Sequence, residues 1–225
     1  MPAGLTIFND NGFLTIDSTW SNMGLRQKSI INTIGRSPTD HGPFRQTATL
    51  SFTAVSPMVF TRCDYFNTLM ISRKTGTNQW FVEIGVEATS SVPVTIYVFD
   101  VTGGMPATQS AGLNVFDEAG NLVFDANSKT FIVTDFLSIG ANPPTQNFTW
   151  RPGRLYAAAV TAPITSRRFV PMTPPLNVYY YLGHRNIASG IQTANVETGQ
   201  MNAPTQANNE YWAPGNIIVA DVTNY

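Results

Sequence analysis

The sequence contains little charge. Lys, Arg, Asp and Glu together make up 12% of its 225 residues, about half of the roughly 25% that is usual in a soluble domain. The strong helix formers Lys and Glu occur only three and five times, whereas Thr occurs 27 times and Asn 19 times. Thr favours strands because it is β-branched, and Asn favours tight turns. The composition therefore predicts an all-β fold, and the weakly charged surface favours a subunit that packs against other subunits.

Cysteine, long apolar runs and basic surface are also scarce. Cys63 is the only cysteine, so an internal disulfide is excluded, and its apolar and aromatic neighbours predict a buried or half-buried, inert thiol. No run of about 18 apolar residues occurs, and the first residues lack the features of a secretory signal. The net charge is −1, which offers no attraction for nucleic acid or anionic lipid. We therefore expect a chain that is made and kept in a cytoplasm, without membrane insertion.

An internal repeat is the most informative feature that is present. Residues 4–17 read GLTIFNDNGFLTID and residues 112–125 read GLNVFDEAGNLVFD, with six identities in fourteen positions. Each copy has a short apolar strand, a polar turn that ends in Gly12 or Gly120, and a second apolar strand. This is the pattern of a β-hairpin whose glycine has a positive φ. The alternative is two unrelated hairpins with similar turn chemistry.

The two copies begin 108 residues apart, which is about half the chain. We therefore expect two β-sandwich-like halves, residues 1–108 and 109–225, each opened by one hairpin. Apolar or alternating segments within the halves predict further strands. The clearest are residues 47–54, 80–87, 94–99, 130–137, 155–160, 176–182 and 216–222. Residues 25–34 fit a helix or a strand equally well.

Residues 183–215 do not fit a compact β domain. They are mostly Asn, Gln, Thr, Ala and Gly, and a structureless stretch above about 15 residues is uncommon unless it is functional or disordered. We expect a long arm or loop that docks on a neighbouring subunit. Its interface anchors would be its largest apolar side chains, Tyr211, Trp212, Met201 and Ile191. The alternative for Trp212 is a place in the core of its own chain.

Residues suited to enzymatic or metal chemistry are few. His41 and His184 are the only histidines, and neither has a ligand partner at zinc-binding spacing, so we interpret both as surface or loop residues. Phosphate-binding glycine loops, nucleophile elbows and zinc-protease motifs are missing. Glu83 and Glu87 share one strand face without converging as the paired acids of a glycosidase do. Acids beside the hairpin turns are expected to cap backbone amides. The prediction is a non-enzymatic protein with no catalytic residues, no cofactor and no metal.

The two hairpin motifs resemble those of a family of small tailed-bacteriophage virion proteins whose function is not established. That family tends to open with Met-x-x-Gly-Leu-x-Ile/Val-Phe-Asn and to carry Gly-Leu-x-Val-Phe-x-x-x-Gly-x-Leu-Val-Phe-Asp in mid-chain. The matching residues here are Gly4, Leu5, Ile7, Phe8, Asn9, Gly12 and Leu14, then Gly112, Leu113, Val115, Phe116, Gly120, Leu122, Val123, Phe124 and Asp125. The resemblance implies no catalytic residues. It implies a place in the particle, with the tail favoured over the capsid.

Three functions remain open at this point. The first is a structural component of the virion tail, at the tail tip, baseplate or tail fibre, which assembles with copies of itself and other virion proteins and supports attachment to a host surface receptor. The second is a carbohydrate- or cell-surface-binding module, suggested by aromatic residues on a neutral polar background. These are Trp80, Trp150, Tyr179, Tyr180, Tyr181 and Trp212. The third is a capsid decoration protein, which the sequence does not separate from the first.

Overall fold

The computed structural model describes residues 6–8, 14–17, 21–35, 44–102, 112–140, 143–161, 165–170, 176–202 and 214–225. These residues form strands, turns and loops, with no α-helix among them. The all-β prediction is therefore confirmed. No helix in the described part of the chain is long and apolar enough to cross a membrane.

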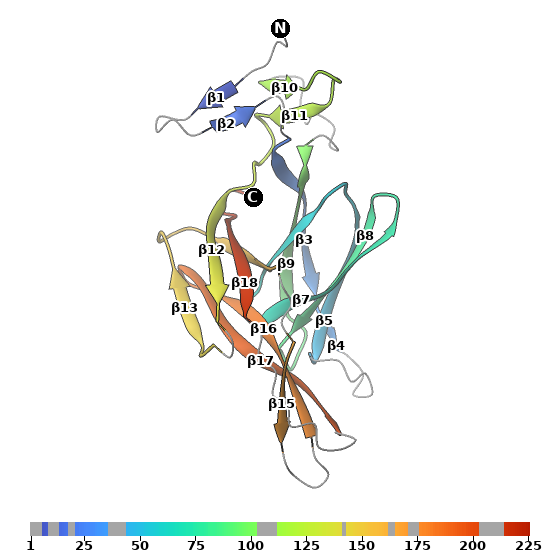
Figure 1. Cartoon of the computed structure of the whole chain (residues 1–225), viewed down its shortest axis with the longest axis vertical. Helices are drawn as coiled ribbons and strands as arrows, with labels where there is room; N and C mark the ends of the chain where they lie inside the picture. Colours follow the sequence, from blue (N-terminus) through green and yellow to red (C-terminus); the bar gives the residue numbers. More distant parts are fainter. Residues whose placement is uncertain are drawn as a thin grey trace.

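Two small β-hairpins lie together at one end of the molecule (Figure 1). β1 (Thr6–Phe8) pairs with β2 (Leu14–Asp17), and β10 (Asn114–Phe116) pairs with β11 (Leu122–Asp125). Both pairs are antiparallel, and both have a register shift between the second and third residues of the first strand. The shifts lie at Ile7/Phe8 and Val115/Phe116, which are 108 positions apart. The sequence repeat is thus a structural repeat.

The turn chemistry of the second hairpin is as predicted. Gly120 has a φ of 82°, and the Asp117 carboxylate accepts a hydrogen bond of 2.7 Å from the backbone N–H of Asn121. Gly12, the counterpart of Gly120, lies outside the described residues. Buried Val115 and Val123 form a small core with Ile7 packed against them, so the two hairpins stabilise each other.

The first half of the chain forms a sandwich of two antiparallel sheets. One contains β6 (Met58–Arg62), β9 (Pro93–Val101) and β3 (Met23–Asn32), and the other contains β7 (Asn67–Gly76), β8 (Gln79–Val86), β5 (Gln46–Thr53) and β4 (Ile34–Gly35). The ambiguous window at residues 25–34 is therefore strand. Alternate residues of β8 and β9 fill the core between the sheets because strand side chains alternate between faces. They include Val82, Ile84, Val86, Val94, Ile96 and Val98.

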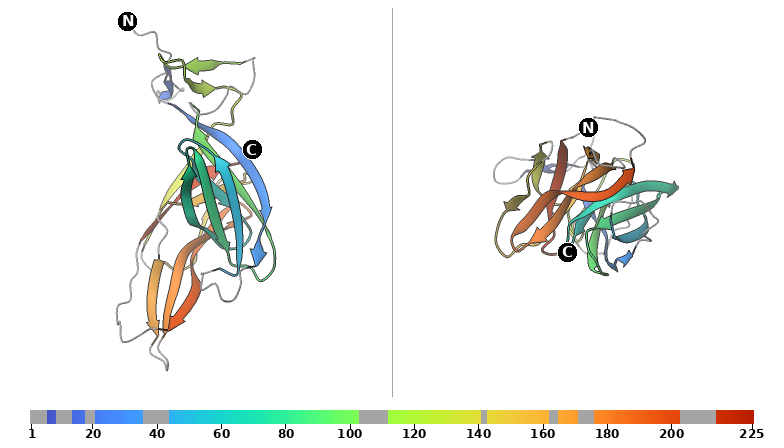
Figure 2. Two further views of the ribbon diagram at one scale, coloured as in Figure 1. Left: turned by 90° about the vertical axis from the view of Figure 1, so that its right-hand side faces the viewer. Right: turned by 90° about the horizontal axis from the view of Figure 1, so that it is seen from below.

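The second half forms a similar sandwich with its own core. One sheet contains β12 (Val133–Ile139), β18 (Gly215–Asp221) and β14 (Tyr156–Val160). The other contains β13 (Gln146–Thr149), β17 (Gly190–Asn202) and β16 (Leu176–Ile187), with β15 (Thr165–Val170) paired to β16. β15 and the adjoining parts of β16 and β17 project at the end opposite the hairpins, as Figure 1 and the left view of Figure 2 both show. The prediction of two sandwich-like halves, each opened by a similar hairpin, is confirmed.

The two sandwiches are joined edge to edge. β6 pairs with β14 in one layer and β7 pairs with β16 in the other. The resulting strand orders are β12-β18-β14-β6-β9-β3 and β13-β17-β16-β7-β8-β5-β4. The expected boundary between the halves, at residues 108 and 109, lies outside the described residues.

Equivalent strands occupy equivalent places on the two sides of this junction. β3 and β12 each follow a hairpin in the chain and each form the outer strand of the six-stranded sheet. Both have a register shift against their neighbour, at Leu25/Gln27 and Val133/Asp135, again 108 positions apart. At each junction, a strand of the first half also pairs antiparallel with the equivalent strand of the second half, β6 with β14 and β7 with β16. A two-fold axis between the halves requires this arrangement. The halves therefore meet as the subunits of a symmetric dimer would, within one chain.

The prediction of an arm over residues 183–215 was wrong for the part that the structure describes. Residues up to Asn202 belong to the long β16–β17 hairpin, and Gly215 begins β18. β17 pairs with β16 on one side and with β13 on the other. These pairings satisfy the backbone hydrogen bonds of β17 although its sequence is not strongly apolar. Because its residues are mostly small or polar, the sequence did not indicate a strand.

Candidate functional site

The junction between the halves contains a buried polar cluster. Thr61 of β6, Asn67 of β7 and His184 of β16 are all buried. The Thr61 hydroxyl donates a hydrogen bond of 2.6 Å to Oδ1 of Asn67, and Nδ2 of Asn67 donates one of 2.8 Å to the carbonyl oxygen of His184. Because buried polar groups are costly unless they are paired, these bonds favour one register between the two halves.

His184 is held as a neutral imidazole. Its Nε2 lies 3.1 Å from Oγ1 of Thr61, whose proton already goes to Asn67, so Nε2 carries the hydrogen and donates it. Nδ1 is buried and has no hydrogen-bond partner in the part of the chain that the structure describes. Burial lowers the pKa of His184 to about 4. The interpretation of His184 as a surface or loop residue was wrong, because it is buried in strand β16. The flanking residues Gly183 and Arg185 do not indicate a strand that crosses the core, which explains the error. His41 lies outside the described residues.

Cys63 lies beside this cluster and is buried, as predicted. Burial raises the pKa of its thiol, which keeps the thiol protonated and unreactive at neutral pH. The backbone N–H of Cys63 donates a hydrogen bond of 3.0 Å to Oδ1 of Asn186, and the backbone N–H of Asn186 donates one of 2.7 Å to the carbonyl oxygen of Cys63. Nδ2 of Asn186 donates a third bond, of 2.6 Å, to the carbonyl oxygen of Tyr156. Asn186 thereby ties β16 to segments of both halves.

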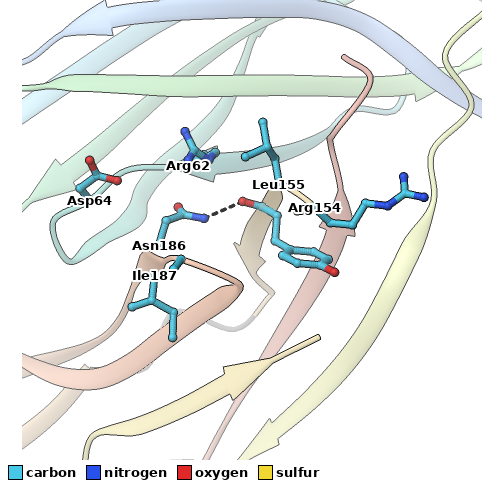
Figure 3. Close-up of a pocket in the computed structure, with 8 residues that line it drawn as sticks. Arg62, Asp64, Arg154, Leu155, Asn186 and Ile187 are labelled. Atoms are coloured by element: carbon cyan, nitrogen blue, oxygen red, sulfur yellow. Dashed lines mark hydrogen bonds between the residues drawn. The ribbon is translucent and has the colours of Figure 1, made fainter. Parts of the chain in front are cut away.

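A pocket of about 190 Å³ opens beside Asn186 (Figure 3). The end of β6, the beginning of β14 and the turn after β16 enclose it, so both halves contribute to its wall. Its lining residues are Arg62, Asp64, Arg154, Leu155, Tyr156, Asn186, Ile187 and Ala188.

Of the charged side chains in this pocket, one forms an ion pair and two do not pair with another described residue. Arg154 forms an ion pair of 3.4 Å with Asp221, and its guanidinium points away from Arg62 and Asp64 (Figure 3). Arg62 has no ion pair with another described residue, and its Nε is buried without a hydrogen-bond partner. The carboxylate of Asp64 likewise makes no hydrogen bond or ion pair within the described part of the chain. The pocket thus presents one free cation and one free anion.

A second candidate site is the apolar surface of β12 and the residue before it. Ile132, Val133 and Phe136 are 54%, 54% and 58% exposed. β12 is the outer strand of its sheet, and no described strand pairs with its free side. Nearby, the Asp135 carboxylate accepts hydrogen bonds from the N–H of Phe136 at 2.8 Å and from Nε1 of Trp150 at 3.0 Å. We call Ile132, Val133 and Phe136 the β12 edge.

One of the predicted interface anchors lies in the core of the molecule. Ile191 is fully buried in the core of the second sandwich, so its proposed interface role was wrong. Met201 lies in β17, opposite Asn177 of β16. Tyr211 and Trp212 lie outside the described residues.

The aromatic residues that suggested a carbohydrate surface are also partly used within the fold. Nε1 of Trp80 donates a hydrogen bond of 2.9 Å to the carbonyl oxygen of Ala54, and Trp150 packs on Tyr156 with ring centroids 5.1 Å apart. Neither tryptophan is an exposed platform. No sequence pattern indicates the pocket, because Arg62 and Asn186 are brought together only by the junction.

Groups of three or more potential metal ligands do not occur among the described residues. Comparisons of the chain with protein-family models, curated proteins and solved structures find no significant match.

Proposed function

We propose that this protein is a non-enzymatic structural component of a tailed-phage virion, at the tail tip, baseplate or tail fibre, where it supports assembly and host attachment. It would act there with copies of itself and with other virion proteins. The observation that carries the assembly role is the β12 edge, with three large apolar side chains more than half exposed on a free outer strand and the residue before it.

Such an edge favours association. A free strand edge offers unpaired N–H and C=O groups to another chain, and exposed apolar side chains gain free energy when they are covered. The scarcity of charge lowers the cost of burying the surrounding surface. The counterpart outer strand β3 exposes Ile30, and β4, the outer strand of the other sheet, exposes Ile34. Two such edges on one molecule suit a component with more than one neighbour.

The location is tested on particles. In purified particles of the phage that encodes this chain, mass spectrometry should detect it, and antibody labelling should place it on the tail. Labelling over the head would support the capsid decoration protein instead, and absence from purified particles would refute a virion role.

The assembly role is tested on the β12 edge. Phe136→Lys removes an exposed apolar side chain and adds a charge, so it should shift purified protein from oligomers to monomers and reduce incorporation into particles. Light scattering after gel filtration measures the first effect. Ser72→Lys on β7, where the side chain is exposed, adds the same charge away from the edge and should leave both unchanged. Equal oligomerisation of the two variants would exclude this edge as the interface.

A further inference from the structure

The pocket beside Asn186 has a preformed wall. Asn186 makes three hydrogen bonds, two with the backbone of Cys63 and one with the backbone of Tyr156. These fix the end of β16 against both halves of the molecule. A ligand would therefore meet the pocket without the cost of ordering its wall.

The free cation of the pocket requires an acceptor. Among the described residues no carboxylate forms an ion pair with Arg62, and its buried Nε has no hydrogen-bond partner, so an oxygen atom that contacts the guanidinium gains a charge-assisted hydrogen bond. A guanidinium matches a carboxylate best, because two parallel N–H groups meet two oxygen atoms. Arg154 is already neutralised by Asp221, so Arg62 is the cation of the pocket that is left for a ligand carboxylate.

The remaining wall favours a sugar over a simple anion. Asp64 adds a free carboxylate, which accepts hydrogen bonds from hydroxyl groups and repels a second acid. Leu155 and Ile187 add apolar surface, against which the C–H face of a sugar ring packs. The volume of about 190 Å³ exceeds several-fold the roughly 30 Å³ that one water occupies in the liquid. It accommodates a sugar ring and leaves a bare carboxylate group poorly enclosed.

We propose that this pocket binds a sugar acid of the uronic type, with the carboxylate on Arg62 and a ring hydroxyl on Asp64. This site is distinct from the β12 edge and does not depend on a place in a virion. An acidic peptide is the rival ligand, and the structure favours the sugar because Asp64 would repel a second acidic side chain.

Titration of the purified protein tests the proposal. Glucuronate should bind saturably, as measured by calorimetry or by NMR shifts of residues that line the pocket, and glucose, which lacks the carboxylate, should bind at least about tenfold more weakly because a charge-assisted hydrogen bond is lost. Arg62→Gln should weaken glucuronate binding by about tenfold or more, and Arg62→Lys by less, because it keeps the charge and loses the fork. Arg73→Gln on β7, away from the pocket, is the matched control and should bind as the parent does.

Several outcomes would overturn the proposal. They are equal affinity for glucuronate and glucose, unchanged glucuronate binding in Arg62→Gln, and tighter Arg62-dependent binding of a glutamate-rich peptide than of glucuronate. Thermal melts identify a variant that has failed to fold, and Asp64→Asn then provides a second test. It removes the charge of an exposed carboxylate and should reduce the preference for glucuronate over acetate, because the ring hydroxyl loses a charged acceptor while repulsion of both carboxylates falls.

Discussion

His184 is a titratable residue where the two halves of the molecule meet. Thr61, Asn67 and His184 satisfy one another across β6, β7 and β16, whereas an apolar junction would allow strands to slip in register. The cost is a buried imidazole whose Nδ1 makes no hydrogen bond with any described residue. Its charged form is disfavoured, and this makes the stability of the junction depend on pH.

We predict that His184 destabilises the fold on acidification. Its pKa is about 4 in the folded protein against an ordinary value of 6.5, so between these values the unfolded chain binds a proton that the folded chain excludes. The contribution is constant above pH 6.5 and is lost as the pH falls toward 4, by about 2–3 kcal/mol at pH 4.5. Urea unfolding at pH 7.5 and 4.5 should show a smaller pH-dependent loss for His184→Gln than for the parent.

The comparison between the two proteins isolates the histidine. Carboxylates also titrate in this window, but they contribute equally to the parent and to His184→Gln. Identical losses in the two proteins would mean that His184 is protonated in the folded state or reached by solvent.

At the scale of elements, the sequence predicts best where side chains alternate. β5, β8, β9 and β18 lie within a residue or two of their predicted positions, because one face of each strand is buried and the period of two is visible. β16 was predicted only as far as Leu182, and β17 was not predicted as a strand. Buried positions of β17 are occupied by Gly190, Thr193 and Ala194. Because these residues are small or polar, the segment has the composition of a loop.

Non-local pairing explains what the sequence did not predict. The pocket and the polar cluster depend on the pairing of β6 with β14 and of β7 with β16. These strands are far apart in the sequence, so no local sequence pattern predicts their pairing. The exposed position of Phe136 likewise depends on β12 being an outer strand. Periodicity assigns a residue to a face of a strand, and only the topology determines what covers that face.

The hairpin turn gives a prediction at this scale. Gly120 has a φ of 82° and open space around it, so Gly120→Val adds backbone strain without a clash. We expect a destabilisation of about 1–2 kcal/mol in the β10–β11 hairpin. Gly140 also has open space and lacks a positive φ in this range, so Gly140→Val is the matched control and should cost about 0.5 kcal/mol or less.

Amide hydrogen exchange in β10 and β11, together with urea unfolding, measures this difference. Similar exchange in both valine variants would remove the support for a left-handed turn. The sequence repeat predicts the same cost for Gly12→Val in the first hairpin.

At the scale of the whole molecule, the chain resembles two subunits that became one. Each sandwich has a separate core, each layer continues across the junction, and each junction strand faces its counterpart. In such an arrangement the junction holds the halves together as a dimer interface would. The residues that connect the halves only raise the effective concentration of one half for the other.

We therefore predict that residues 1–108 and 109–225, produced together as separate chains, assemble into one complex. A tag on either fragment should recover both, and the strand content by circular dichroism should match that of the intact chain. Each fragment alone should aggregate, because it leaves β6 and β7 or β14 and β16 as open edges. Asn67→Ala removes the bonds to Thr61 and His184 and should lower recovery of the complex, whereas Asn32→Ala, at an exposed position, should not. Two fragments that stay soluble, folded and separate would show that the halves are independent domains and that the junction contributes little to the fold.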